Sequence, residues 1–237
     1  MSKIGFIPAR SGSTRLKNKN IKIVAHRPLI YWTVRSAIQS NSLDKIIFSS
    51  DSKKYYRLLM RYLKKDGIKT DLIEFDYREK KFTNNKSKIF DYIKFRLINK
   101  FNLNENDLIV LMLPTCPLRS INTIKKGIKL SIDKKKNVFS VTKYDFHLSF
   151  AIKIVKNSWK PVFKKSPLLT GDTQGQNQKI YFHPTGVINC LYVKILKKNY
   201  ESIYYKSLPL VVERNESIDI DTKEDLKLVT NFLNKKF

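Results

Sequence analysis

For about its first 140 residues, the chain alternates short apolar runs of strand length with longer segments of helical spacing. A strand, a helix and a second strand in succession require a crossover connection, which makes the two strands parallel. We therefore predict an α/β fold with a mostly parallel sheet flanked by helices. The expected strands cover residues 4–7, 45–49, 71–75, 108–113 and 138–141, and the expected helices cover 29–40, 53–65, 87–100 and 121–132.

The run LIVLML at 108–113 is the most apolar of these strands. A strand without polar alternation is typical of a central position in a parallel sheet, where helices cover both faces. We expect this strand to lie in the middle of the sheet.

The alternation of strand-like and helix-like segments is interrupted between about residues 144 and 186. The segments SFAIKIV and WKPVF form a hairpin pattern, and the polar run TGDTQGQNQ has no periodicity. Strands at 187–193 and 208–212 and a helix at 222–233 then return. We predict one domain over 1–237 with an inserted arm or lid at about 144–186.

The net charge of +27 has two explanations. A strongly positive net charge is typical of a nucleic-acid-binding protein. It also fits lysines spread over solvated faces, because most of the basic residues are lysines in scattered pairs and triples. We favour the second explanation and expect no nucleic-acid partner, but a surface field that attracts small anionic substrates.

The two cysteines, Cys116 and Cys190, lie in no CxxC or Cys/His cluster, so neither disulfides nor zinc are predicted. The sequence shows no signal segment and no stretch of about 18 apolar residues. We expect a cytoplasmic protein without a membrane partner.

Ligands of a parallel sheet bind at the carboxyl ends of its strands, so the functional residues are expected in the loops at those ends. The loop after the first strand, IPARSGSTRLKNKN, contains no acid. Gly12 between two serines lets backbone N–H groups approach an anion, and four cations surround it. A phosphate site is predicted, with a basic surface turn as the alternative. The four cations are Arg10, Arg15, Lys17 and Lys19.

Two other loops after predicted strands give weaker indications of a functional site. Asp51 or Ser52, after the strand at 45–49, is expected to cap the helix at 53–65. In LPTCPLR at 113–119, two prolines stiffen the loop, which is expected to present Thr115 and Arg119 to the crevice.

The segment ESIDIDTKED places Asp219 and Asp221 two residues apart, on one face of an extended chain. Two carboxylates beside a phosphate site suit Mg²⁺, which binds one or two carboxylates and substrate phosphates. The alternative makes Asp221 a helix cap and Asp219 a surface residue. Thr222 and Asp225 form a variant of the capping box.

Taken together and in this order, five stretches resemble the acylneuraminate cytidylyltransferases, or CMP-sialic acid synthetases, over nearly the whole chain. They are IPARSGSTRLKNKNI, FSSDS, LPTCPLRS, GQNQKIYFHPTGVIN and SIDIDTKEDL, of which the first and last are the most specific. The resemblance implies a Rossmann-like nucleotidyltransferase fold whose arm forms a homodimer. It also implies a Mg²⁺-dependent reaction of CTP with an acidic 2-keto sugar, used for cell-surface glycans.

The resemblance also assigns roles to residues. Arg10, Lys19, Asp219 and Asp221 are implied in catalysis, with Arg10 and Lys19 on the triphosphate and the two aspartates on Mg²⁺. Nucleotide contacts are implied for Ala9, Ser13, Asn20, Arg78 and Ser87, and sugar contacts for Thr115, Arg119, Gln176 and His183.

Several positions depart from the family pattern. Leu113 stands where glutamine is usual, and Thr14 where lysine is frequent. Gly175 and His183 replace frequent arginines. These departures indicate a different nonulosonic acid, such as a legionaminic- or pseudaminic-like sugar, or a weakened or lost activity. A KDO cytidylyltransferase and a non-catalytic basic nucleic-acid-binding protein on the same fold are the alternatives.

Overall fold

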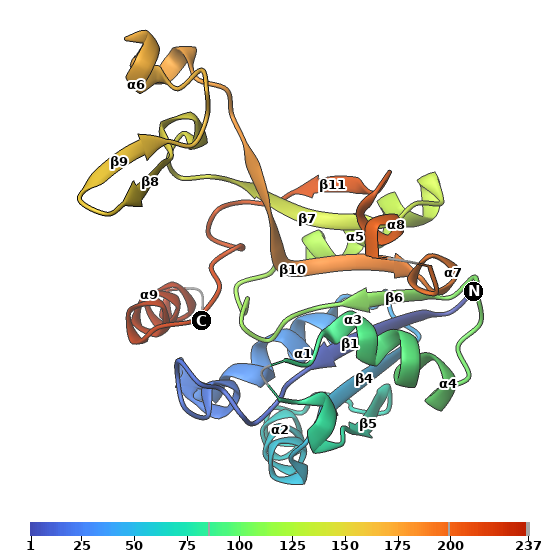
Figure 1. Ribbon diagram of the computed structural model, residues 1–237. Coiled ribbons are helices and arrows are strands. Elements are labelled where there is room, and N and C mark those ends of the chain that lie inside the picture. The colour runs from blue at the N-terminus through green and yellow to red at the C-terminus, as the bar shows by residue number, and fades with distance from the viewer. Residues whose placement is uncertain (85, 199, 236–237) are drawn as a thin grey trace.

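The computed structural model describes residues 1–84, 86–198 and 200–235, apart from the side chains of residues 200 and 202. Its body is built on a seven-stranded sheet in the order β11-β7-β10-β6-β1-β4-β5 (Figure 1). The strands are β1 (Lys3–Pro8), β4 (Lys45–Ser50), β5 (Ile73–Tyr77), β6 (Leu108–Leu111), β7 (Val138–Lys143), β10 (Phe182–Tyr192) and β11 (Leu208–Val211).

The sheet is parallel except for one strand. β1 pairs in parallel with β4 and β6, β4 with β5, and β7 with β11. β10 lies between β6 and β7 and runs antiparallel to both. The predicted α/β class with a mostly parallel sheet is confirmed.

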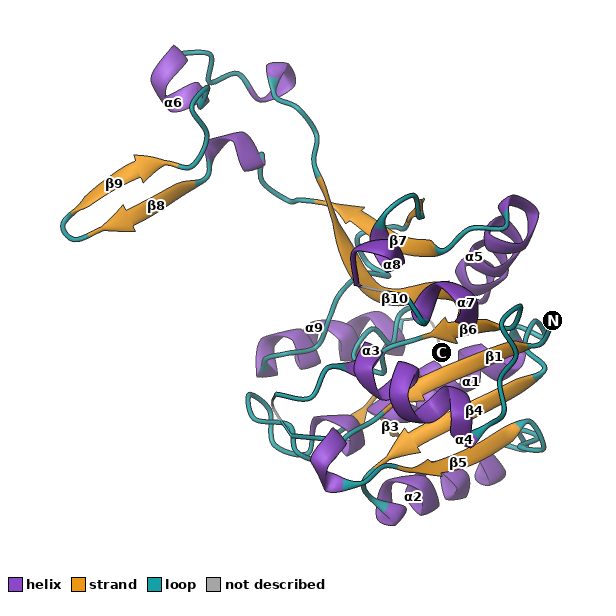
Figure 2. Cartoon of the chain, turned by 45° about the vertical axis from the view of Figure 1, so that its right-hand side comes forward, coloured by secondary structure: helices purple, strands orange, loops and turns teal. Residues whose placement is uncertain are grey.

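Helices cover both faces of the sheet. One face carries α1 (Leu29–Gln39), α2 (Lys53–Lys65), α5 (Ile121–Lys134) and α9 (Lys223–Asn234). The other face carries α3 (Ile89–Tyr92), a π-helical segment (Ile93–Leu97), α4 (Ile98–Lys100), α7 (Val193–Leu196) and α8 (Tyr200–Tyr204) (Figure 2). Among the described residues, no helix has the length and apolarity needed to cross a membrane.

The central strand β6 has side chains in both cores. Leu108 and Val110 pack against the helices of the first face, and Ile109 and Leu111 against those of the second. All four are at most 2% exposed. This confirms that the apolar run marks a strand buried on both sides.

Between β7 and β10 the chain leaves the body and forms an arm. The arm contains the hairpin of β8 (Ile152–Val155) and β9 (Ser158–Pro161), followed by α6 (Pro167–Thr170). In both views it stands away from the sheet (Figures 1 and 2). β10 starts at Phe182, before the predicted residue 187, because the returning chain already pairs with β7 at the base of the arm.

β10 and the loop after β6 are in close contact at Gly186. The N–H group of Leu113 donates to the Gly186 carbonyl at 3.0 Å. A Cβ atom on Gly186 would lie only 2.7 Å from Leu113 Cδ1 and 3.0 Å from Leu113 Cβ. Gly186 therefore permits an approach that other residues would obstruct.

We predict that Gly186→Ala lowers the free energy of unfolding by about 1–3 kcal/mol, the usual cost of overpacking. Urea unfolding measures the change, and Leu113→Ala in the same chain should restore part of it. Gly12→Ala is the matched control, since its Cβ would meet nothing within 4 Å. Equal stability of Gly186→Ala and the native chain would contradict the packing described.

Candidate active site

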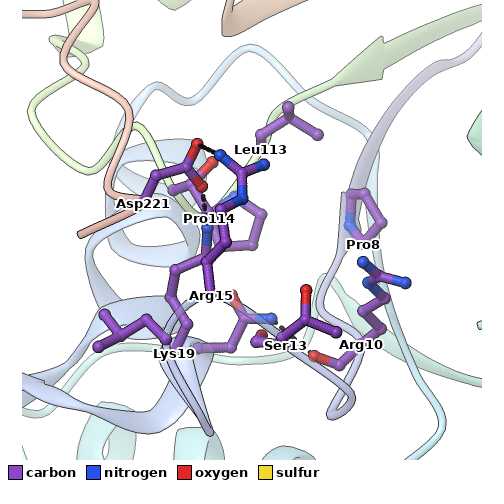
Figure 3. A pocket seen from close by; sticks show the side chains of 12 residues that line it. Pro8, Arg10, Ser13, Arg15, Lys19, Leu113, Pro114 and Asp221 are labelled. Carbon is purple, nitrogen blue, oxygen red and sulfur yellow. Dashed lines mark hydrogen bonds and ion pairs between the residues drawn. The ribbon is translucent and has the colours of Figure 1, made fainter. Parts of the chain in front are cut away.

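Two adjoining cavities, of about 190 and 330 Å³, lie at the carboxyl end of β1 and share Pro8, Arg10 and Leu113. The first is lined by Pro8, Arg10, Ser13, Thr14, Arg15, Leu16, Lys19, Asn20, Leu113, Pro114, Thr115 and Asp221 (Figure 3). The second is lined by Pro8, Arg10, Arg78, Phe82, Thr83, Asn84, Ser87, Ile89 and Leu113.

Asp221 draws the cationic loop after β1 to the first cavity. Its carboxylate accepts from Lys19 Nζ at 2.8 Å and forms a second ion pair with Arg15 (Figure 3). Three of the four loop cations, Arg10, Arg15 and Lys19, line this cavity, whereas Lys17 lines neither. The structure therefore brings together the predicted Lys19 and Asp221, more than 200 residues apart in the chain.

The path of this loop is fixed by two polar contacts. The Asp51 carboxylate accepts from the Ser11 N–H at 2.8 Å and from the Ser11 hydroxyl at 2.9 Å. Asn20 Nδ2 donates to the Arg10 carbonyl at 2.8 Å. Ser52 is the N-cap residue of α2, as expected, but its side chain makes no capping hydrogen bond. Asp51 does not cap the helix, because its carboxylate binds Ser11 of the first loop.

Arg10 lies between the two cavities and lines both. Its Nη1 atom donates to the carbonyl oxygens of Thr83 and Asn84, each at 3.1 Å. Both acceptors are backbone oxygens. These two bonds hold the Arg10 guanidinium where the cavities meet.

The segment before α9 has the predicted alternation. Ile220 is fully buried and Ile218 packs against the core, whereas Asp219 is exposed. Although the residue keeps contact with solvent, protein atoms around its carboxylate partly desolvate it. This desolvation, and secondly the charge of Asp221, raise the pKa of Asp219 above its ordinary value. Thr115 opposes this rise with a hydrogen bond.

Thr222, and not Asp221, caps α9. Thr222 Oγ1 accepts from the N–H of Asp225 at 3.1 Å, and Asp225 Oδ2 accepts from the N–H of Thr222 at 2.8 Å. The reciprocal capping box predicted from the sequence is present. The alternative role of Asp221 as a helix cap is therefore wrong, and its carboxylate faces the cavity instead.

The second cavity contains Arg78 and Ser87, which the resemblance places near the nucleotide. The Arg78 side chain is only 4% exposed, and its Nε and Nη2 atoms donate to Ser49. Ser87 Oγ donates to the Lys81 carbonyl and Asn84 Oδ1, each at 3.0 Å. Ala9 lines neither cavity; it is fully buried.

Of the loop at 113–119, only the first half reaches the cavity. Thr115 lines the first cavity, and its carbonyl accepts from the N–H of Ile220 at 2.9 Å, which holds the Asp219–Asp221 segment in place. Cys116 is buried, with a pKa raised to about 12 by burial.

Arg119 is not available for the sugar contact that the resemblance implies. It is 3% exposed, and burial lowers its pKa to about 10. Its guanidinium donates to Thr33 Oγ1 and to backbone carbonyls that join the loop to β10. Those acceptors are the carbonyls of Val187 at 2.6 Å, Leu113 at 2.8 Å and Gly186 at 3.0 Å. The expectation is corrected to a structural role.

Gln176 and His183 lie in the arm region and line neither cavity. Gln176 Nε2 donates to Gln174 Oε1 at 3.2 Å, and the His183 ring lies 4.8 Å from the ring of Tyr144. A single chain therefore does not bring these predicted sugar contacts to the cavities.

Comparisons with known proteins agree with this geometry. The family model described as cytidylyltransferase matches residues 4–70, which include the cationic loop. The N-acylneuraminate cytidylyltransferase of Escherichia coli O18:K1:H7 is 27% identical over 98% of this chain, which spans about half (52%) of that relative's length. The CMP-N,N'-diacetyllegionaminic acid synthase of Legionella pneumophila is 27% identical, over 97% of this chain and 95% of the relative.

A pseudaminic acid cytidylyltransferase of Campylobacter jejuni is 24% identical over 96% of this chain and 94% of its own. Over nearly its whole length, the chain is thus similar to cytidylyltransferases named for acylneuraminic, legionaminic and pseudaminic acids. The resemblance predicted from the five stretches is thereby confirmed.

Two solved structures of low sequence identity share the fold of this chain. A CMP:2-keto-3-deoxy-manno-octonic acid synthetase complexed with CTP matches with a TM-score of 0.65 at 14% identity, over 100% of both chains. A 4-diphosphocytidyl-2C-methyl-D-erythritol synthase from Anaerococcus prevotii matches with a TM-score of 0.66 at 17% identity, over 98% of this chain and 96% of its own.

We predict that Arg119→Ala lowers the free energy of unfolding by at least about 3 kcal/mol, since each buried acceptor left unpaired costs about 1–3 kcal/mol. Chemical denaturation measures the loss. Arg214→Ala removes an arginine from the exposed pair with Asp145 and should cost less than about 1 kcal/mol. Equal losses in the two variants would contradict the structural role of Arg119.

Proposed function

We propose that the chain transfers CMP from CTP to the anomeric hydroxyl of a nonulosonic acid and releases pyrophosphate. The observation that supports this most is the pairing of the two cavities. A cavity with three cations and one carboxylate suits a triphosphate, and the adjoining cavity with Arg78 and Ser87 suits a nucleoside. Arg10 stands between them, where the α-phosphate would lie.

The cations of the first loop are suited to a highly charged ligand. Arg15 and Lys19 both share Asp221, so an arriving triphosphate offers each cation additional oxygen acceptors. The Lys19 side chain is 14% exposed, which strengthens its interaction with phosphate relative to a fully solvated lysine. The Arg15 side chain is 73% exposed, so it can change its conformation when a ligand binds.

Mg²⁺ fits the acidic segment beside the first cavity, in which Asp221 lines the cavity and Asp219, two residues earlier, lines neither cavity. Among the described residues there is no group of three or more His, Cys, Asp or Glu that could hold a metal. Asp219 and Asp221 supply the one or two carboxylates that Mg²⁺ usually takes from a protein, and water and phosphate oxygens supply the rest. When bound, Mg²⁺ would neutralise charge on the phosphate oxygens.

In the proposed reaction, the anomeric oxygen forms a bond to the α-phosphorus and the bond to the β-phosphate oxygen breaks. Asp219 or Asp221 accepts the hydroxyl proton as the bond forms. Arg10 and Lys19 stabilise the negative charge that grows on the α-phosphate and on the departing pyrophosphate. Catalysis then depends on positioning and electrostatic stabilisation, without a covalent enzyme intermediate.

A nonulosonic acid is favoured over KDO as the acceptor. The sequence relatives are named for acylneuraminic, legionaminic and pseudaminic acids, whereas the KDO enzyme matches in fold at 14% identity. A nucleic-acid-binding role has no comparable support. We further propose a cytoplasmic setting, because CTP is available there and both cysteines are free.

We predict that CTP with a nonulosonic acid and Mg²⁺ releases pyrophosphate, measured over a panel of sialic, legionaminic and pseudaminic acids and KDO. Asp221→Ala should lower turnover by about 10²–10³-fold, as expected for an electrostatic group at the reacting centre. Asp133→Ala, in an exposed pair with Lys129, is the matched control. No turnover with any nine-carbon acid would contradict the proposal.

We also propose that the arm forms a homodimer and carries Gln176 and His183 toward the partner's site. Its surface is strongly apolar for a segment that stands in solvent: Ile154 is 80% and Leu169 63% exposed. Trp159 and Phe146 are exposed as well. Exposed apolar area of this kind marks interaction surfaces.

We predict that the native chain sediments as a dimer and that Ile154→Glu with Trp159→Glu converts it to a monomer, because a charge in an apolar interface is desolvated without a partner. Sedimentation velocity measures both. Leu228→Glu, at an exposed apolar residue of α9, is the control and should remain dimeric. A native monomer would refute the dimer proposal while leaving the cavities unaffected.

A further inference from the structure

A buried acidic network adjoins the second cavity, and the proposed reaction does not use it. Asp76, on β5, has a fully buried side chain. Its carboxylate accepts from the hydroxyl of Tyr92 and from Lys100 Nζ, each at 2.6 Å, and from the hydroxyl of Ser49. A buried carboxylate is retained only when it is hydrogen-bonded and paired in this way.

The helix that carries two of these partners has an unusual geometry. Tyr92 and Lys100 are eight residues apart, but two turns of an α-helix need only about seven residues. The π-helical segment Ile93–Leu97 lies between them and takes up the additional residue. Both side chains therefore reach the same carboxylate. Such π segments occur frequently at functional sites.

The network ends at Arg78, which lines the second cavity. The Ser49 hydroxyl donates to Asp76 and accepts from Arg78 Nε at 3.1 Å, so the carboxylate sets its direction. The Ser49 carbonyl accepts from Arg78 Nη2 at 3.1 Å. The guanidinium also lies 4.9 Å from the centre of the Tyr92 ring. Two contacts thus link Arg78 to groups that Asp76 orients.

One part of the guanidinium remains for a ligand. Within the described residues, none accepts a hydrogen bond from Arg78 Nη1, whereas Nε and Nη2 are engaged. The guanidinium is planar and rigid, so hydrogen bonds from two of its nitrogens also fix the direction in which the third nitrogen donates. Cytosine presents acceptors at N3 and O2, whereas uracil presents an N–H group at position 3.

We propose that Asp76, together with Tyr92, is a positioning group that holds Arg78 with its Nη1 donors toward the acceptor edge of a cytosine base in the second cavity. The inference rests on the proposed function, since the base belongs to CTP. Asp76 and Tyr92 act through Arg78 and do not contact the nucleotide.

The test is equilibrium binding of CTP and UTP, with steady-state kinetics beside it. Tyr92→Phe removes the hydroxyl and retains the ring beside Arg78. We expect about 5–10-fold weaker CTP binding, the equivalent of one ordinary hydrogen bond, because the lost hydroxyl acts on Arg78 only through Asp76. UTP binding should change less, and KM for CTP should rise while kcat stays within about twofold. Asp76→Asn should act in the same direction.

A double-mutant cycle separates positioning from a general loss of structure. In an Arg78→Ala background, Tyr92→Phe should have no further effect on CTP binding. Glu74→Gln, on the same strand in an exposed pair with Lys45, is the matched control and should bind CTP like the native chain.

If the native chain binds CTP and the folded Tyr92→Phe and Asp76→Asn variants bind it within twofold, the inference is overturned while the proposed function stands. A Tyr92→Phe effect that persists in the Arg78→Ala background also overturns it. A native chain that binds no CTP overturns the proposed function together with this inference.

Discussion

The shared ion pair of Asp221 with Lys19 and Arg15 joins the two ends of the fold. The cations follow the first strand, and the carboxylate precedes the last helix. Each charge lies in a segment with its own anchors. The loop that contains Lys19 is held by the hydrogen bonds of Asp51 to Ser11. The segment of Asp221 is held by the buried Ile220 and by the cap of α9 at Thr222. The first cavity therefore depends on segments from both ends of the chain, which couples the site to the fold.

The two buried arginines show how the body supports this site. All three side-chain nitrogens of Arg119 donate to backbone carbonyls or to Thr33, and these bonds fix the loop after β6 against β10. Arg78 is held on one side only and keeps a nitrogen for the second cavity. The same residue type thus serves the scaffold in one case and the proposed base site in the other. What differs is the set of acceptors that surrounds each side chain.

Much of the fold could be predicted because its signals are local. The apolar run at 108–113 identifies a doubly buried strand, and Thr222 with Asp225 identifies the start of α9. The antiparallel direction of β10 could not be predicted, because an apolar run has the same pattern in both directions. The longer start of β10 at Phe182 was missed for a related reason, since pairing with β7 is a long-range contact.

The site was predicted in part for the same reasons. The cations after β1 and the Asp219–Asp221 pair are visible because the loop positions and charges are local. The burial of Arg119 and the contact of Asp51 with Ser11 depend on elements far apart in the chain. The Asp76–Tyr92 contact depends in addition on a π-helical segment that has no clear sequence signal. Long-range hydrogen bonds thus decide which polar residues are structural.

A triphosphate site formed by the cationic loop and Asp221, beside a cytosine site, can be tested by calorimetric titration of the native chain with CTP, CDP and CMP in the presence of Mg²⁺. We expect the affinity to fall with each phosphate removed, by about tenfold or more per step, since each charge-assisted hydrogen bond contributes about 1.5–3 kcal/mol. Lys19→Ala should reduce the difference in affinity between CTP and CMP. Equal affinity for the three nucleotides would show that the cationic loop does not bind the phosphates.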